Sequence, residues 1–481
     1  MSLFAILNSA ANSLLNTQTQ IGTVSDNIAN SNSTGYVARN ANLTESDPQA
    51  GGLDTVQITR AVNTALQQEL LQQNSSTANQ SFINNIYNQL EQLDGSSTGT
   101  PSLVSAMQNF TSAFQALQAT PESATAQQAV IQAGEGLAQT VQTIAGGVQS
   151  MITQTQQQTS TDVNTLNTTL ASISTLNNQI VAAKGAGQST AALQDALDSD
   201  IQTVSSLVPV KATFADNGTV QLSTPQGVQL VGVTAASFAF NASTDTIYAA
   251  NDPTQTSLNG SFSGGQIGAE ISALDTSPSA VASQNPGSAP FQKVLDQLNT
   301  FVDQFFAPTP PGPATAFQAA YNNATPVNAG EQASDFFTIS NFGATPNDDV
   351  SGFQVNPALV NGTATVKQSA ASTVVAQLVA NTNSFSSDGV TASNTTYVGI
   401  AEAIASNQTQ RAQQAQSSQQ SAAAALTTTQ TAYQNATGVN VNTELSQLIV
   451  LQNTYGASAK VLSVVQQLFT ALDAAVGATA G

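Results

Sequence analysis

The sequence has no Cys, no His and no Trp among its 481 residues. Without Cys and His, the chain lacks the ligands for zinc fingers, His-ligated zinc sites and iron–sulfur clusters. Thiol catalysis and any catalytic triad that uses a His base are excluded for the same reason. We therefore expect no metal, no cofactor and no enzymatic activity.

Charge is also scarce. The chain has 8 Lys and Arg residues against 28 Asp and Glu, so its net charge is −20 and charged residues make up 7%, compared with about 25% in an average soluble domain. So few cations argue against nucleic acid and against anionic membrane surfaces as partners. No run of about 18 apolar residues predicts a membrane span. The first five residues also lack the basic and apolar regions of a secretory signal.

Those features alone predict a cytoplasmic protein of about three domains. However, a Cys-free composition rich in Asn and Thr is also typical of bacterial surface proteins, so the compartment stays open at this point.

Both ends of the chain carry apolar residues every seven positions. Such a seam, with a mean spacing of 3.5 residues, predicts a coiled coil, although an amphipathic helix on a globular core has the same pattern. The positions that form the seams, and that we expect to pack between helices or subunits, are Leu7, Leu14, Ile21, Ile28, Leu448, Leu451, Tyr455, Leu462, Val465, Phe469 and Leu472.

Helical spacing continues between the ends. Apolar residues three and four positions apart predict helices over 83–93, 103–117, 120–184, 193–204, 291–306 and about 396–436. The third of these is expected to start at Thr120-Pro121-Glu122, with Thr120 as the N-cap. The proline-rich stretch at 308–313 predicts an extended loop.

The pattern changes to strict alternation after Pro209. Val210, Ala212 and Phe214 precede the turn residues Asp216-Asn217-Gly218, and Val220 and Leu222 follow them, which predicts a β-hairpin. Further short alternating runs extend to about residue 248 and end near Gly264-Gly265. The fold class we predict is mainly α with a β-rich insert.

The candidate chemical motifs are weak. Asp195 and Asp198 share a helix face while Asp200 turns away, so the three carboxylates do not converge, and a solvated helix face is the favoured interpretation. Gly264 to Gly268 lack the Lys and Ser/Thr of a phosphate-binding loop, which favours an exit turn from the β-rich insert. The sequence therefore offers no active site.

One stretch, Asp26-Asn27-Ile28-Ala29-Asn30 followed by Thr34-Gly35-Tyr36, resembles the N-terminal signature of the bacterial flagellar axial proteins. This family includes rod, hook and hook-associated subunits. Gly35 can adopt the positive φ that ends a helix, and the side chains of Asn27 and Asn30 can bind backbone groups near that end.

Four further stretches resemble the hook-associated members in order and spacing. They are 110–122, 176–210, 216–231 and 438–457. Two departures stand out, because Asp195-Ala196-Leu197-Asp198 lacks the Arg of the family's Asp-X-Arg-Asp step and Ala126-Gln127-Gln128 lacks that of its Ala-Arg-Gln step. Local salt bridges are therefore in doubt.

The resemblance implies a structural adaptor that joins the flagellar hook to the filament and lies in the extracellular flagellum after export without a cleaved signal peptide. Its implied partners are copies of itself in a ring, the hook protein, a second junction protein on the filament side and an export chaperone. It also favours the coiled-coil interpretation, with chain ends that order only on assembly. The implied organisation is an N-terminal axial helix and turn (1–44), a helical rod (45–206), a small β-rich outer domain (207–268), a returning rod (269–436) and a C-terminal axial helix (437–481).

Two alternatives remain. The first is another axial subunit, such as a hook or distal rod protein, although these lack the long helical section from 103 to 207. The second is a secreted wall hydrolase, which needs a glutamate in an apolar cleft, and the sequence shows no such setting.

Overall fold

The computed structural model describes residues 3–33, 35–44, 55–93, 102–283, 285–306, 316–328, 330–331, 335–339 and 348–478. Thr34 of the motif and the proline-rich loop at 308–313 lie outside the described residues. Among the described helices, none is both long and apolar enough to span a membrane.

The chain forms two compact units, and it passes between them within three of its helices and just before β6. The first unit comprises residues 1–75, 166–237 and 424–481. Its elements are α1 (Leu3–Asn30), β1 (Arg39–Thr44), β2 (Thr55–Arg60), the start of α2 (Thr64–Leu93), the end of α4 (Ala124–Gly185), α5 (Ala191–Leu207), β3 (Lys211–Phe214), β4 (Val220–Ser223), β5 (Gln229–Val231), the end of α13 (Tyr397–Thr437) and α14 (Val441–Ala478).

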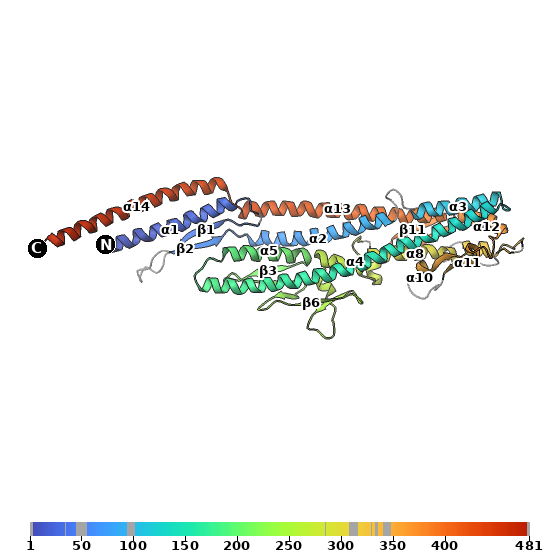
Figure 1. Ribbon diagram of the computed structural model, residues 1–481, viewed down its shortest axis with the longest axis horizontal. Helices are drawn as coiled ribbons and strands as arrows, with labels where there is room; N and C mark the ends of the chain where they lie inside the picture. Colours follow the sequence, from blue (N-terminus) through green and yellow to red (C-terminus); the bar gives the residue numbers. More distant parts are fainter. Residues whose placement is uncertain are drawn as a thin grey trace. The chain divides into compact units, whose positions relative to one another are not determined.

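In the first unit, α1 and α14 lie side by side and run in opposite directions, so the two chain termini are at the same end of the pair (Figure 1). Strands β1 and β2 form an antiparallel hairpin in which Arg39 lies opposite Arg60. A second antiparallel sheet has the order β3-β4-β5. The hairpin leads from α1 into α2, so it connects the terminal pair to the rest of the unit.

The second unit comprises residues 76–165 and 238–423. Besides parts of α2, α4 and α13, it contains α3 (Leu103–Ala119), β6 (Phe238–Asn241), β7 (Thr246–Ala249), η2 (Asn259–Phe262), α6 (Gly265–Leu274), α7 (Pro278–Val281), α8 (Pro290–Phe306), α9 (Phe317–Asn322), β8 (Phe337–Ile339), α10 (Asp348–Gly352), β9 (Phe353–Val355), α11 (Pro357–Val360), η3 (Gln368–Ala370), α12 (Ala371–Leu378), β10 (Asn383–Ser387) and β11 (Val390–Thr395).

A cluster of aromatic rings forms the core of the second unit. Phe110 on α3 has its ring centroid 5.1 Å from that of Phe114 and 5.5 Å from that of Phe317, with edge-on or tilted geometry. Phe305 on α8 packs against Tyr397 at 5.0 Å. Edge-to-face pairs contribute beyond their buried area, so this cluster holds the helices together where the sequence has few charges.

The predicted fold class is confirmed: the described chain is mainly helical, with small antiparallel sheets. The predicted hairpin is present as β3 and β4, with Lys211 opposite Ser223. Two details differ. The helix expected from Thr120 begins at Ala124, because Thr120 instead caps the end of α3 through its backbone N–H. Ser123 then accepts a hydrogen bond from the N–H of Ala126 at the start of α4.

Strands also appear where only helix or irregular chain was expected. The β1–β2 hairpin lies within 39–60, and β8 to β11 lie between 337 and 395. In addition, Gly265 begins α6, so the glycine-rich stretch read as an exit turn is a helix start. The five-part division of the chain stays a prediction.

Candidate functional site

The amide of Asn27 ties the end of α1 to strand β1. Its Nδ2 donates to the carbonyl oxygen of Arg39 at 2.8 Å, and its Oδ1 accepts from the N–H of Arg39 at 3.0 Å and from the hydroxyl of Tyr36 at 2.9 Å. Asn27 is only 1% exposed. The amide binds the N–H and the carbonyl of Arg39 as a neighbouring strand would. It therefore fixes where the hairpin leaves the helix.

The other motif residues shape the turn between α1 and β1. Asn30 is the last residue of α1, and its Nδ2 donates to the carbonyl of Asp26. Gly35 adopts a φ of +80°, as expected, but in the turn after the helix and not at its end. Tyr36 carries the Arg39 guanidinium over its ring at 4.9 Å, a cation–π contact.

Two arginines of the hairpin meet two aspartates of α5. Arg39 pairs with Asp195 at 2.7 Å, Arg60 pairs with the same carboxylate at 2.9 Å, and Arg60 also pairs with Asp198. The Nε2 of Gln67, on α2, donates to Asp198 at 2.8 Å. We call Asn27, Arg39, Arg60, Gln67, Asp195 and Asp198 the joint, because together they connect α1, β1, β2, α2 and α5.

The interpretation of Asp195 and Asp198 as part of a solvated helix face is wrong. Asp198 is 7% exposed, and the side chain of Arg60 is 6% exposed. Burial raises the pKa of Asp198 above its usual value, whereas Arg60 and Gln67 act in the opposite direction. The arginine missing from the local Asp-X-Arg-Asp step is thus supplied from β1 and β2.

The corner between α13 and α14 also contacts this region. The N–H of Ala38 donates to the carbonyl of Thr437 at 2.8 Å. A Cβ at Gly438 would lie 2.5 Å from the carbonyl oxygen of Gln434, so only glycine fits this corner. The side chain of Asn440 then accepts from the N–H groups of Asn442 and Thr443, which caps α14.

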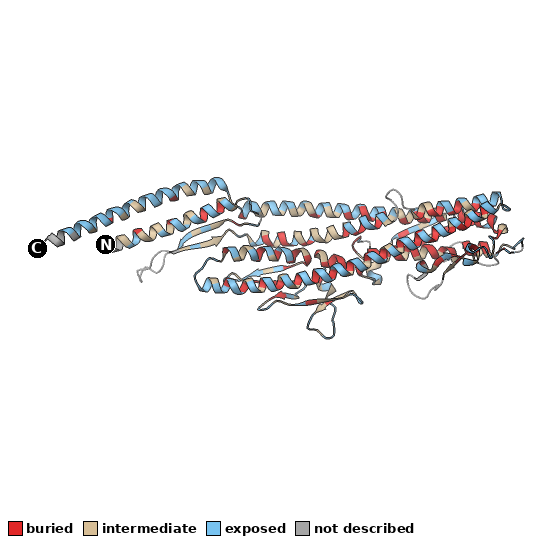
Figure 2. Ribbon diagram, in the orientation of Figure 1, coloured by how far each residue is buried: buried red, intermediate tan, exposed pale blue. Residues whose placement is uncertain are grey.

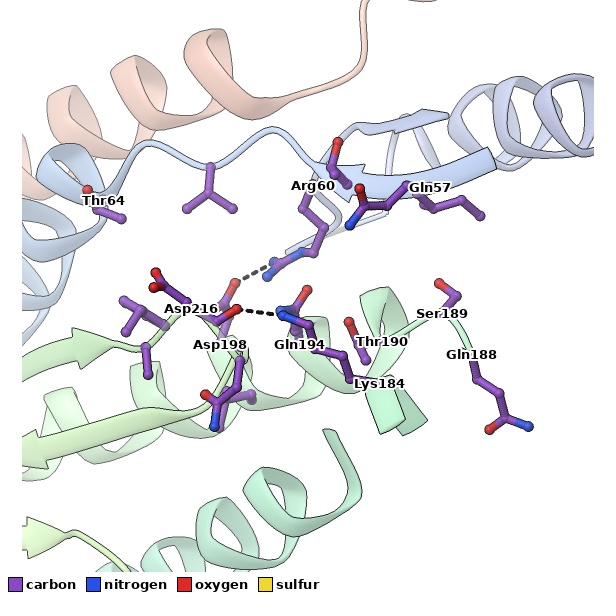
Figure 3. A pocket seen from close by; sticks show the side chains of 18 of the residues that line it. Gln57, Arg60, Thr64, Lys184, Gln188, Ser189, Thr190, Gln194, Asp198 and Asp216 are labelled. Atoms are coloured by element: carbon purple, nitrogen blue, oxygen red, sulfur yellow. Dashed lines mark hydrogen bonds and ion pairs between the residues drawn. The ribbon is translucent and has the colours of Figure 1, made fainter. Parts of the chain in front are cut away.

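A cleft of about 880 Å³ lies beside the joint. Arg60 and Asp198 line it and point toward each other, and Lys184, Gln194 and Asp216 line it from the last turn of α4, from α5 and from the β3–β4 turn (Figure 3). The Oε1 atom of Gln67, which also lines the cleft, is buried without a hydrogen-bond donor. The cleft walls combine amide and hydroxyl side chains with apolar ones such as Ile58 and Phe214.

The predicted seam residues lie on the α1–α14 pair. Leu451 and Val465 are buried, Tyr455 is 39% exposed and Leu472 is 55% exposed, while the remaining seven are half-buried: Leu7, Leu14, Ile21, Ile28, Leu448, Leu462 and Phe469. The hydroxyl groups of Ser13 and Ser458 lie 3.2 Å apart between the helices.

That contact explains why Leu472 is exposed. It lies fourteen residues beyond Ser458, whereas α1 begins only ten residues before Ser13, so α1 has no residue opposite it. Ala10, Thr17 and Val24, which lie seven residues apart on α1, are buried, and so are Thr23 and Asn27. The predicted seam did not include Thr17. Supercoiling of the pair stays a prediction.

A second apolar face of α14 has no partner within the described chain. Val461, Val464, Leu468 and Leu472 follow each other at helical spacing and are 47%, 54%, 50% and 55% exposed. Figure 2 shows most of α14 in the colour of exposed residues. Four large apolar side chains in one stripe are unusual on a surface and typical of an interface.

Several of the few cations are buried away from the joint. Lys293 is 1% exposed, and its Nζ donates to the carbonyls of Ser283 at 2.7 Å and Ser288 at 2.5 Å. Lys367 donates to the carbonyl of Asn322, and Arg411 donates to that of Asp388. In the second unit these cations therefore hold loop carbonyls in place.

One buried carboxyl group was missed. Glu270 on α6 is 0% exposed, and burial together with Asp162 raises its pKa to about 9. This buried glutamate was not anticipated from the sequence, and it lies among polar side chains such as Asp162 and Gln266. Glu270 does not line the cleft beside the joint, and its side chain is fully buried.

Within the described residues, no three or more Asp or Glu side chains are placed to hold a metal ion. The guanidinium groups and carboxylates of the joint form ion pairs with one another. Its geometry serves to connect structural elements at fixed positions.

Comparison with known proteins gives two family matches. Residues 87–305 match the flagellar hook-associated protein FlgK helical domain. Residues 430–474 match the C-terminal region of the flagellar basal body rod FlgEFG proteins. Both matches are to flagellar axial proteins, a class of structural proteins.

Within that class the chain is similar to flagellar hook-associated protein 1. It is 26% identical to that protein of Escherichia coli (strain K12) over 246 residues, which cover 49% of the chain and 44% of the relative. It is 21% identical to that of Bacillus subtilis (strain 168) over 512 residues, which cover 97% of both. The chain thus spans about half the length of the Escherichia coli relative and nearly all of the Bacillus relative.

A solved structure, that of the flagellar hook junction protein FlgK from Burkholderia pseudomallei, is also similar. It matches with a TM-score of 0.46 and 18% identity, and the match covers 57% of this chain and 47% of that one.

Proposed function

We propose that the chain is a structural subunit that joins the flagellar hook to the filament and assembles with copies of itself through α1 and α14. The observation that carries the proposal is the second apolar face of α14, formed by Val461, Val464, Leu468 and Leu472. Burying this face against a neighbouring copy stabilises the assembly by about 25 cal/mol for each Å² removed from water.

The joint supports the same role. An axial subunit must hold its terminal helices in a defined direction relative to the parts that follow, because neighbouring copies then make equivalent contacts. Asn27 and the arginine–aspartate pairs connect the base of α1 to α5 through backbone and side-chain contacts. In this proposal the joint transmits the orientation of the terminal pair.

The further partners are the hook protein on one side, a second junction protein on the filament side and an export chaperone. Export without a cleaved signal peptide and a final location at the hook–filament junction belong to the same proposal. The names of the relatives support it, since they are hook-associated and junction proteins. We also propose that the chain has no catalytic activity.

Deletion of the gene followed by electron microscopy tests the proposal. Cells that keep their hooks but lose attached filaments support a junction role. Loss of the hooks themselves indicates the alternative of a hook or distal rod subunit. An assay of the purified chain on cell-wall material tests the other alternative, and wall degradation would overturn the structural role.

A further inference from the structure

The carboxyl group of Glu270 lies against α4 in a pocket of polar side chains that water does not reach. Glu270 is 0% exposed, Asp162 is 7% exposed and Thr159 is 0% exposed. Gln266 connects the two acids, since its Nε2 lies 2.7 Å from Asp162 Oδ2 and 3.2 Å from Glu270 Oε1. Gln158 donates to the other oxygen of Asp162 at 3.0 Å.

One oxygen of this cluster has no donor. Glu270 Oε2 is buried and receives no hydrogen bond from the described residues, while both oxygens of Asp162 do. A buried carboxylate oxygen without a donor is costly. A proton on Oε2 removes that cost, because the group then becomes a donor and the Asp162 carboxylate is its acceptor.

Among the residues that the structure describes, no cation acts on Glu270 to stabilise two negative charges. On α4, Asp162 is the charged group that faces Glu270. From α2, the neutral Asn79 donates to the Gly265 carbonyl at the start of α6, and η2 carries no charged residue. Lys293 on α8 donates to loop carbonyls, Asp296 accepts from Gln292, and Asp245 of the β6–β7 turn accepts from Gln156.

We propose that Glu270 and Asp162 share one proton and thereby form a latch that fastens α6, and the β6–β7 hairpin before it, to helix α4. The latch closes while Glu270 carries the proton. When hydroxide removes that proton, two carboxylates face each other in a site without water, and α6 separates from α4. The pKa of Glu270, raised to about 9, sets an alkaline range for the release.

Hydrogen exchange of the full chain tests the latch. Peptides from 238–274 are compared with peptides from α3, at pH 7 and pH 10, with labelling times scaled to the intrinsic exchange rate. For the wild type we expect protection in 238–274 to fall about 100-fold between pH 7 and pH 10, because each pH unit up to the pKa near 9 weakens the latch about tenfold, while α3 changes little. In E270Q the amide keeps a donor toward Asp162 at every pH, so the additional loss disappears.

Two further variants separate the latch from a merely structural contact. Burial is the main cause of the raised pKa of Glu270, and D162N removes the charge that raises it further, so the release moves to lower pH. E135Q alters an exposed glutamate on the same helix and leaves the release unchanged. Equal loss of protection in the wild type and in E270Q, or an unchanged midpoint in D162N, would overturn the proposal.

Infrared spectroscopy gives a test that needs no variant to fold. At neutral pH the wild type must show the carbonyl stretch of a buried protonated carboxyl group, which disappears as the pH passes the release. Absence of that band at neutral pH contradicts the shared proton.

Discussion

Asn27 binds both backbone groups of Arg39, at 2.8 Å to the carbonyl oxygen and 3.0 Å to the N–H. The same arginine then pairs with Asp195 through its side chain. A motif residue on the N-terminal helix and an acid on α5 are therefore connected through one residue of strand β1. This connection gives the first prediction.

Replacing Asn27 with Ala leaves the N–H and carbonyl of Arg39 and the hydroxyl of Tyr36 without their partner. Because these groups are partly buried, we expect N27A to lower the free energy of unfolding by about 1–3 kcal/mol. The matched control is N30A, one turn further along α1, whose hydrogen bonds are exposed. Urea denaturation measures both, and equal losses in the two variants would contradict the role assigned to Asn27.

Arg60 is the cation that pairs with both aspartates of the joint, and it is the partner of the buried Asp198. R60Q leaves Asp198 buried without its guanidinium partner, so we expect a loss of about 3 kcal/mol in unfolding free energy. D198N removes the buried negative charge, so a cation is no longer needed to balance it. This variant should therefore lower the unfolding free energy by less than R60Q does. D200N, on the same helix outside the joint, should stay within about 0.5 kcal/mol of the wild type. If R60Q were no more harmful than D200N, the joint would not stabilise the fold.

Lys293 gives a pH prediction with a defined sign. Burial lowers its pKa from 10.5 to about 8 in the folded chain. Between these values the unfolded chain binds more protons, so the cost of burying the ammonium is full below pH 8 and disappears as the pH rises. The stability of the wild type relative to K293M should therefore increase over this range, by at most about 1.4 kcal/mol per pH unit.

The same measurement on K211M is the control, because Lys211 is exposed at the start of β3. A flat difference between the wild type and K293M from pH 8 to 10.5 would show that Lys293 titrates normally.

The terminal helices should be the least protected helices of an isolated subunit. Much of α14 is exposed, and its second apolar face finds no partner within the described chain. Amide exchange of the soluble monomer should be fast over 3–30 and 441–478 compared with α3, and slow after assembly. Strong protection of both helices in the monomer would mean that they are stable without neighbours.

The periodicity of the apolar residues was sufficient to predict the helices. For α13 it predicted bounds within about a residue of those observed. Apolar side chains at i, i+3 and i+4 report directly on which face is buried. The start of α4 was misplaced because Thr120 has the side chain of an N-cap yet serves α3 as a C-cap. Propensity alone does not distinguish the two ends of a short connection.

The joint could not be predicted from the sequence in the same way. Asp195 and Arg39 are 156 positions apart, and Arg60 and Asp198 are 138 apart. Helical spacing shows that Asp195 and Asp198 share a face, but it does not show what packs against that face. Only the motif residues Asn27 and Tyr36 gave a signal, through the resemblance, that this region matters. Glu270 gave none, because a single acid in an apolar helix is not a pattern.

The proposed function depends above all on the second apolar face of α14, through which copies of the subunit assemble into the junction. The test complements a deletion strain with the wild type, with V464N/L468N or with Q466N. Val464 and Leu468 are exposed in the subunit, so V464N/L468N should fold as the wild type does. Q466N changes an exposed polar residue on the same helix and is the control. The measurement is the fraction of hooks that carry a filament in electron micrographs. We predict that the wild type and Q466N restore filaments, while V464N/L468N leaves bare hooks. Filaments restored equally by all three would contradict the account.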